Sequence, residues 1–273
     1  MRSLRDVGFV ELRARRLALA LRQARRLAAW TVEPSRWAAP RVGDAADFPH
    51  RVYERTIPIA RDDRAAHPVL ERGKLTNVAL AAPCFDGIVV TEDAPLSFWR
   101  ALGRVTAARG FEWGMELRAG CIVPALGGGI CLISNALFEM AARLGWNILE
   151  RHGHSLDAGL AAEPGLDATV LWPHVDLRVA PASGSARLEV RVRNGRLHVA
   201  AFAKDQHARA VHLTLVREPA PEPFRASTIV RTIDGTREII ARDRKRVVRE
   251  SERARNCLTC NEDACHARVR VAR

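Results

Sequence analysis

The sequence predicts an α+β fold, with helices early in the chain and antiparallel strands late. Apolar residues recur at helical spacing in the first half, most clearly over residues 130–144. In the second half, apolar and polar residues alternate on both sides of Asn194-Gly195, the residue pair typical of a type I′ β-hairpin turn. Hydrophobic residues make up 48% of the 273-residue chain, enough for a substantial core. We therefore expect a mixed or antiparallel sheet, with a glycine loop leading into a buried helix.

The first predicted element is a basic amphipathic helix over residues 4–30. Its function would be to dock on an anionic surface, such as a membrane, or on a partner. The alternative, which we favour, is that its Leu and Ala side chains pack on the domain while the arginines face water. Arginines interrupt the apolar stretch and leave LALAL too short for a signal peptide. No apolar run reaches the roughly 20 residues of a membrane span, so we expect a cytoplasmic protein, peripheral to the membrane if this helix binds lipid.

The other elements follow in chain order. Residues 1–73 would form the helical arm and a Pro-containing linker, 74–203 the main domain, 204–250 additional strands packed on it, and 251–273 a tail. Helices are expected at residues 70–82, 95–103 and 130–144, the last ended by Gly145. Strands are expected near residues 87–90, 147–152, 168–172, 176–180, 187–202, 211–216, 228–233 and 237–241.

The most informative segment is the glycine run before the central helix. Gly127, Gly128 and Gly129 can adopt positive φ and allow close approach to the backbone. Cys131 then falls in the first helical turn, where free N–H groups and the helix macrodipole favour a thiolate. We predict that Cys131 is a nucleophile. The alternative is a cysteine buried against the sheet, since free cysteines are among the most buried residues.

Two histidines and a carboxylate follow this cysteine. His152 and His154 alternate, so on a strand they would share a face, with Arg151 on the other. Either imidazole could be the base for Cys131, and Asp167 could orient it. The order Cys, His, Asp resembles that of transglutaminase-like and other papain-related folds, and supports a hydrolase or acyl transferase. The alternatives are structural hydrogen bonding for His152, turn capping for Asp167, or a metal site formed by both histidines and a carboxylate.

The motifs GGGIC, SNALF, ERHGHS, DATV and VDLR, with the upstream KLTN segment, resemble the VanW-like family, named after an accessory gene of vancomycin-resistance clusters. The resemblance runs from about residue 74 to 178 and implies this domain, but no settled reaction. Within these motifs, we expect a ligand to be held by a set of six residues: Gly127, Gly128, Gly129, Ser134, Asn135 and Arg151. The chain departs from the family pattern at Leu132, where glutamine is usual, and at Pro173-His174, where Asn-Tyr is common.

The C-terminal tail carries a second signal. Cys257 and Cys260 are spaced C-x2-C, and Cys265 and His266 follow within ten residues of the first cysteine. Thiolates at this spacing can meet at one metal ion, so the expected cofactor is zinc or an iron–sulfur cluster. Adjacent Cys265 and His266 are poorly placed to ligate together, so the fourth ligand could come from elsewhere. The alternative is a redox-active or incidental C-x2-C pair.

Charge and cysteine content narrow the function. The formal net charge of +12 is spread along the chain, so we predict attraction to acidic surfaces but no specific nucleic-acid binding. Six cysteines without a secretory signal argue for a reducing compartment over a disulfide framework. The first hypothesis is a thiol-dependent hydrolase or acyl transferase acting on a cell-envelope or polysaccharide-linked substrate. The second is a non-catalytic module that binds a ligand or peptide through the glycine loop.

Overall fold

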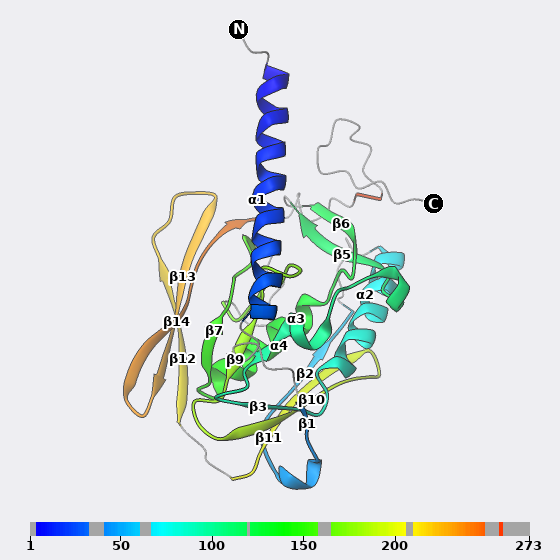
Figure 1. Cartoon of the computed structure of the whole chain (residues 1–273). Coiled ribbons are helices and arrows are strands. Elements are labelled where there is room, and N and C mark those ends of the chain that lie inside the picture. Colours follow the sequence, from blue (N-terminus) through cyan, green and yellow to red (C-terminus); the bar gives the residue numbers. More distant parts are fainter. Residues whose placement is uncertain are drawn as a thin grey trace.

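The computed structural model describes residues 4–32, 41–60, 67–118, 121–157, 165–205, 210–248 and 257–258. It confirms the α+β class. The described α-helices are α1 (Leu4–Val32), α2 (Pro68–Ala81), α3 (Phe98–Leu102) and α4 (Cys131–Arg143). Most strand pairs are antiparallel, and the long paired strands come late in the chain (Figure 1).

The described strands form four sheets. The largest has the order β1-β3-β10-β11-β2, and contains β1 (Arg41–Val42), β2 (His50–Pro58), β3 (Ile88–Thr91), β10 (Ser185–Arg193) and β11 (Arg196–Ala203). The second has the order β12-β13-β14-β8, and contains β8 (Leu156–Asp157), β12 (Val211–Glu218), β13 (Phe224–Ile233) and β14 (Thr236–Val247). The two small sheets are β4-β9-β7, with β4 (Leu96–Ser97), β7 (Asn147–Glu150) and β9 (Arg178–Ala180), and the hairpin of β5 (Trp113–Arg118) with β6 (Cys121–Leu126).

Helix α4 lies at the centre of the molecule and contacts strands of three sheets (Figure 1). Its apolar side chains Ile133, Leu137 and Phe138 are fully buried, as the helical spacing predicts. Burial of side chains of this size stabilises the fold by about 1.5–3 kcal/mol each. Gly145, with φ of 70°, ends the helix in the left-handed conformation that favours glycine. The position of Cys131, the first residue of α4, is therefore fixed by the core.

The arm α1 is anchored at its C-terminal end. The Gln23 amide donates to the Trp172 carbonyl at 3.1 Å, and Arg26 makes a bidentate pair with Glu150 at 2.8 and 2.7 Å. Trp30 packs edge-on against Trp172, with 5.4 Å between ring centroids. Earlier turns of α1 extend beyond the body of the molecule (Figure 1), and Leu17, Leu19 and Leu21 are exposed. Of the helices in the described part of the chain, none has the length and apolar character that a membrane span requires.

Three predicted strands differ from the structure. Residues 168–172 form no strand, only a bridge between Leu171 and Val175, because their polar groups bond to the helix α4 and to the loop before β8. Strand β7 stops at Glu150, so the histidines after it lie in a loop and not on a strand. Strand β14 runs for 12 residues, because its far half pairs with both β13 and β8.

Candidate active site

The glycine loop joins β6 to α4 and is held by a buried amide. Asn77 of α2 is fully buried; its amide nitrogen donates to the carbonyls of Glu112 and Gly128, both at 3.0 Å, and its oxygen accepts the Glu112 N–H at 2.8 Å. A side chain at Gly128 would stand 2.5 Å from the carbonyl carbon of Gly114, so the two backbones touch directly. These contacts fix the loop in front of Cys131.

Cys131 lines a cavity of about 1240 Å³ together with the glycine loop. Walls of the cavity come from α2, the β5–β6 hairpin, α4, the loop before β8, the segment 166–172 and one residue of β14. Leu132 also lines the cavity, so an apolar side chain stands where the family pattern has glutamine. The thiol is therefore open to a space large enough for a substrate.

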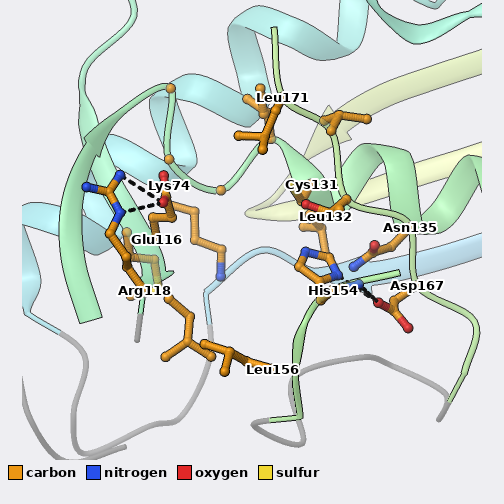
Figure 2. Close-up of a pocket in the computed structure, with 18 of the residues that line it drawn as sticks. Lys74, Glu116, Arg118, Cys131, Leu132, Asn135, His154, Leu156, Asp167 and Leu171 are labelled. Atoms are coloured by element: carbon orange, nitrogen blue, oxygen red, sulfur yellow. Dashed lines mark hydrogen bonds and ion pairs between the residues drawn. The ribbon is translucent and has the colours of Figure 1, made fainter. Parts of the chain in front are cut away.

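The structure brings together three of the predicted catalytic side chains. His154 contacts the Cys131 thiol, and its Nδ1 lies 2.7 Å from Oδ2 of Asp167. The backbone N–H of His154 donates to the same carboxylate oxygen at 2.9 Å. Figure 2 shows the imidazole ring between Cys131 and Asp167. Because Asp167 engages Nδ1, Nε2 is the ring nitrogen available to exchange a proton with the thiol, as a general base requires.

The electrostatics of these groups favour a thiolate and an imidazolium. Burial by itself raises the pKa of the Cys131 thiol. The hydrogen bond and charge of His154, the Val170 N–H and the Thr169 hydroxyl outweigh it, so the pKa lies below its usual value. Burial by itself lowers the pKa of His154, but hydrogen bonds to Asp167 and Cys131 raise it to about 9. The pair can therefore hold opposite charges near neutral pH.

A charged cluster behind the site holds Asp167. Burial would raise the pKa of this carboxyl, but His154 and Lys245 bring it well below its usual range. Lys245 of β14 pairs with Oδ1 of Asp167. Arg151 lies 3.4 Å from the same oxygen, donates to the Asp167 carbonyl at 2.7 Å, and makes a bidentate pair with Asp243 at 2.5 and 2.7 Å. The Asp167 carboxylate is thus fixed from two sides.

Four other predicted site residues have different surroundings. His152 is exposed, and its ring lies 3.3 Å from Glu150, so the expectation that it shares a face with His154 is wrong. The Ser134 hydroxyl is buried and donates to the Ala168 carbonyl at 2.6 Å. Asn135 lines the cavity, while its oxygen accepts the Ala168 N–H at 2.8 Å. Arg151 is buried behind Asp167. Ser134 and Arg151 therefore orient the segment that carries Asp167, and the structure does not bring them to the cavity wall.

The predicted metal ligands Cys260, Cys265 and His266 lie outside the described residues. Cys257 is described: its N–H donates to the Ile122 carbonyl of β6 at 2.9 Å, next to the hairpin that lines the cavity. Across the described ranges, no three side chains of the metal-binding types come together. Metal binding by the tail stays a prediction.

Comparison with known proteins identifies the domain. Residues 73–202 match the family described as VanW like protein. This segment is a VanW-like domain. The resemblance predicted from the motifs is thereby confirmed. Over 102 residues the chain is 33% identical to YoaR, an uncharacterized protein of Bacillus subtilis, and over 138 residues it is 26% identical to the vancomycin B-type resistance protein VanW of Enterococcus faecalis.

These alignments cover 37% and 48% of this chain, and 33% of YoaR and 50% of VanW. The chain thus spans at most about half the length of the curated relatives it matches. No solved structure matches the chain.

Sequence reasoning missed several residues around the site. Asn77 and Lys74 belong to the KLTN segment, but helical spacing gave no reason to single them out. Asp243 and Lys245 lie beyond the VanW-like segment and alternate on β14, so both point to the same side. In the sequence, the available signal was two charged residues of opposite sign, two positions apart, in a segment that could form a strand. Lys245 pairs with Asp167, 78 positions away, and Asp243 pairs with Arg151, 92 positions away, so only folding identifies these partners.

Proposed function

We propose that this protein is a thiol-dependent acyl transferase or hydrolase, with Cys131 as nucleophile, His154 as acid and base, and Asp167 as the group that orients His154. The observation that supports this most directly is the imidazole held between the thiol and the buried carboxylate (Figure 2). A thiolate at the start of a helix, facing a large cavity, has both the electron pair and the access that a nucleophile needs.

The chemistry follows from these positions. The Cys131 thiolate attacks a carbonyl carbon and forms a C–S bond, and the negative charge moves to the carbonyl oxygen. Cys131 is the first residue of α4, so the positive end of the helix dipole favours this oxyanion. The imidazolium of His154 gives its proton to the leaving group, and a thioester remains. An amine or water then attacks the thioester, loses a proton to His154, and releases the acyl group.

The proposed substrate class is suggested by the description of one relative. VanW of Enterococcus faecalis is described as a vancomycin B-type resistance protein. This description supports an acyl substrate from the cell envelope, such as a peptide or a polysaccharide-linked group. The cavity volume would admit a segment of several residues.

The first prediction concerns the pH dependence of alkylation. Iodoacetamide should modify Cys131 with a midpoint well below the usual thiol pKa of about 8.5. His154→Gln should move the midpoint up towards that value and slow the reaction at pH 7 at least roughly tenfold. His152→Gln is the matched control, because this exposed ring contacts Glu150 and not the thiol. The rate at each cysteine is followed by peptide mass spectrometry.

Acylation is tested separately. p-Nitrophenyl acetate should add an acetyl group to Cys131, and an added amine should remove it as the amide. Cys131→Ser should show neither reaction at this position. An ordinary midpoint in the wild-type chain, without acetylation of Cys131, would refute the proposal and favour the non-catalytic binding module.

A further inference from the structure

Asn135 of α4 lines the cavity one helical turn after the nucleophile. Cys131 and Asn135 are four residues apart, so they lie on the same side of the helix, with Cβ atoms about 5–6 Å apart. Side chains on a helix lean towards its N-terminus, so the Asn135 amide lies over the turn that carries the thiol. Figure 2 shows this amide pointing towards the ring of His154, which contacts Cys131.

A backbone partner fixes the orientation of this amide. The Ala168 N–H donates to Oδ1 of Asn135 at 2.8 Å. A backbone N–H is always a donor, so the amide atom that it meets is the oxygen. The Ala168 residue is itself fully buried, and its carbonyl accepts the Ser134 hydroxyl at 2.6 Å. With Oδ1 held by Ala168, Nδ2 is the end of the half-buried amide that can donate to a ligand in the cavity.

The other α4 side chains on the cavity wall have no N–H group to offer. They are Cys131, Leu132, Ala136 and Glu139. Leu132 stands directly beside the nucleophile, where the family pattern has glutamine, and the amide of a glutamine would be a donor. In the described helix α4, the amide donor near the thiol is therefore at position 135 and not at position 132.

The proposed reaction creates a charge that such a donor stabilises. When the Cys131 thiolate attacks a carbonyl carbon, an electron pair moves to the carbonyl oxygen. A donor that is already oriented before the reaction stabilises this oxyanion more than it stabilises the substrate. From this arrangement we infer that Asn135 is a further catalytic residue, whose Nδ2 donates to the oxyanion of the tetrahedral intermediate. The inference rests on the proposed function and assigns one more group at the same site.

Two reactions of the same thiol test this role. With p-nitrophenyl acetate, the Cys131 sulfur bonds to the carbonyl carbon and an oxyanion forms. The C–O bond then breaks, and p-nitrophenolate leaves with its electron pair. With iodoacetamide, the sulfur displaces iodide from a CH₂ carbon, and no oxyanion forms. Both reactions use the thiolate, so the thiolate fraction cancels in the ratio of the acetylation rate to the alkylation rate at Cys131. Peptide mass spectrometry measures both rates.

Asn135→Ala should lower this ratio by roughly tenfold or more, because it removes the N–H donor. Asn135→Asp keeps an oxygen for the Ala168 N–H but has no N–H of its own, so its ratio should fall as well. Ser134→Ala is the matched control. It removes the neighbouring bond to the same Ala168 peptide, yet Ser134 does not line the cavity. This control should leave the ratio unchanged even where the two separate rates shift.

A wild-type ratio in either Asn135 variant would overturn the inference. An equal fall in the Ser134 variant would also overturn it, since the ratio would then report the packing around Ala168 and not a donor. If Asn135→Ala does not fold, Asn135→Asp decides the question by the same criterion, because it keeps the bond to Ala168. Failure of the proposed function would be seen separately, in a wild-type chain with an ordinary alkylation midpoint and no acetylation of Cys131.

Discussion

Replacing Lys245 by methionine should weaken both the fold and the activation of Cys131. Lys245 lies outside the VanW-like segment, yet its amine pairs with the Asp167 carboxylate that bonds to His154. The side chain of Asp167 is only 2% exposed and that of Lys245 13%. Loss of the amine leaves a buried carboxylate with less compensation, while methionine keeps a similar volume.

The magnitude follows from the contacts that remain. Removing one partner of a buried ion pair lowers the free energy of unfolding by roughly 3–5 kcal/mol when the other charge is left uncompensated. Asp167 keeps His154 at 2.7 Å and Arg151 at 3.4 Å, so we expect a loss of about 1–3 kcal/mol in the free energy of unfolding. The site also loses a positive charge, which makes a thiolate less favourable. The midpoint of Cys131 alkylation should rise by about one pH unit.

The stability difference should depend on pH. Because Lys245 helps to lower the pKa of Asp167, its contribution is present above the unfolded-state pKa of about 3.9 and is lost as pH falls through the folded-state pKa. The gap between wild type and variant should therefore narrow in acid.

Urea unfolding at several pH values, together with iodoacetamide rates, would measure both effects. Arg244→Met is the matched control, since this neighbouring cation is exposed and lies over the Phe224 ring at 4.6 Å, away from Asp167. The Arg244 variant should lose about 0.5–1 kcal/mol in the free energy of unfolding and keep the midpoint of Cys131 alkylation unchanged. A Lys245 variant that matches this control in both the free energy of unfolding and the alkylation midpoint would refute the role given to Lys245.

Two further predictions concern the loop and the tail. Gly129→Ala should lower the free energy of unfolding, measured by urea titration, by about 2–4 kcal/mol, because its φ is positive and the new Cβ would strike Lys74. Gly195 also has a positive φ but faces open space, so Gly195→Ala should lower the free energy of unfolding by only about 1 kcal/mol. Equal losses would contradict the packing argument. If the tail holds a metal, metal analysis should find about one zinc ion per chain or a coloured iron–sulfur cluster. The double variant Cys257→Ser, Cys260→Ser should lose the metal while the domain stays folded. Native protein that contains no metal would exclude the site.

Local sequence patterns determined most of the elements. The stripe on α4 depends only on the positions of apolar residues along 13 residues, and the hairpin of β10 and β11 only on alternation and on Asn194-Gly195. Both are short-range properties, and the structure contains both. The GGGIC motif likewise placed Cys131 at a helix start, because glycine flexibility and helix onset are properties of neighbouring residues. Motifs in the same region were specific enough to predict the VanW-like domain.

Tertiary structure alone decided which groups meet. His152 and His154 are two residues apart and look equivalent in the sequence, but β7 ends before them and the loop turns only His154 towards Asp167. Lys245 comes to the same carboxylate because β14 pairs in parallel with β8, directly after His154. Such pairing joins residues nearly a hundred positions apart, and its energy comes from burial and hydrogen bonds summed over whole sheets. No local pattern carries that information, so the sequence could suggest the chemistry of Cys131 but not the charged cluster that supports it.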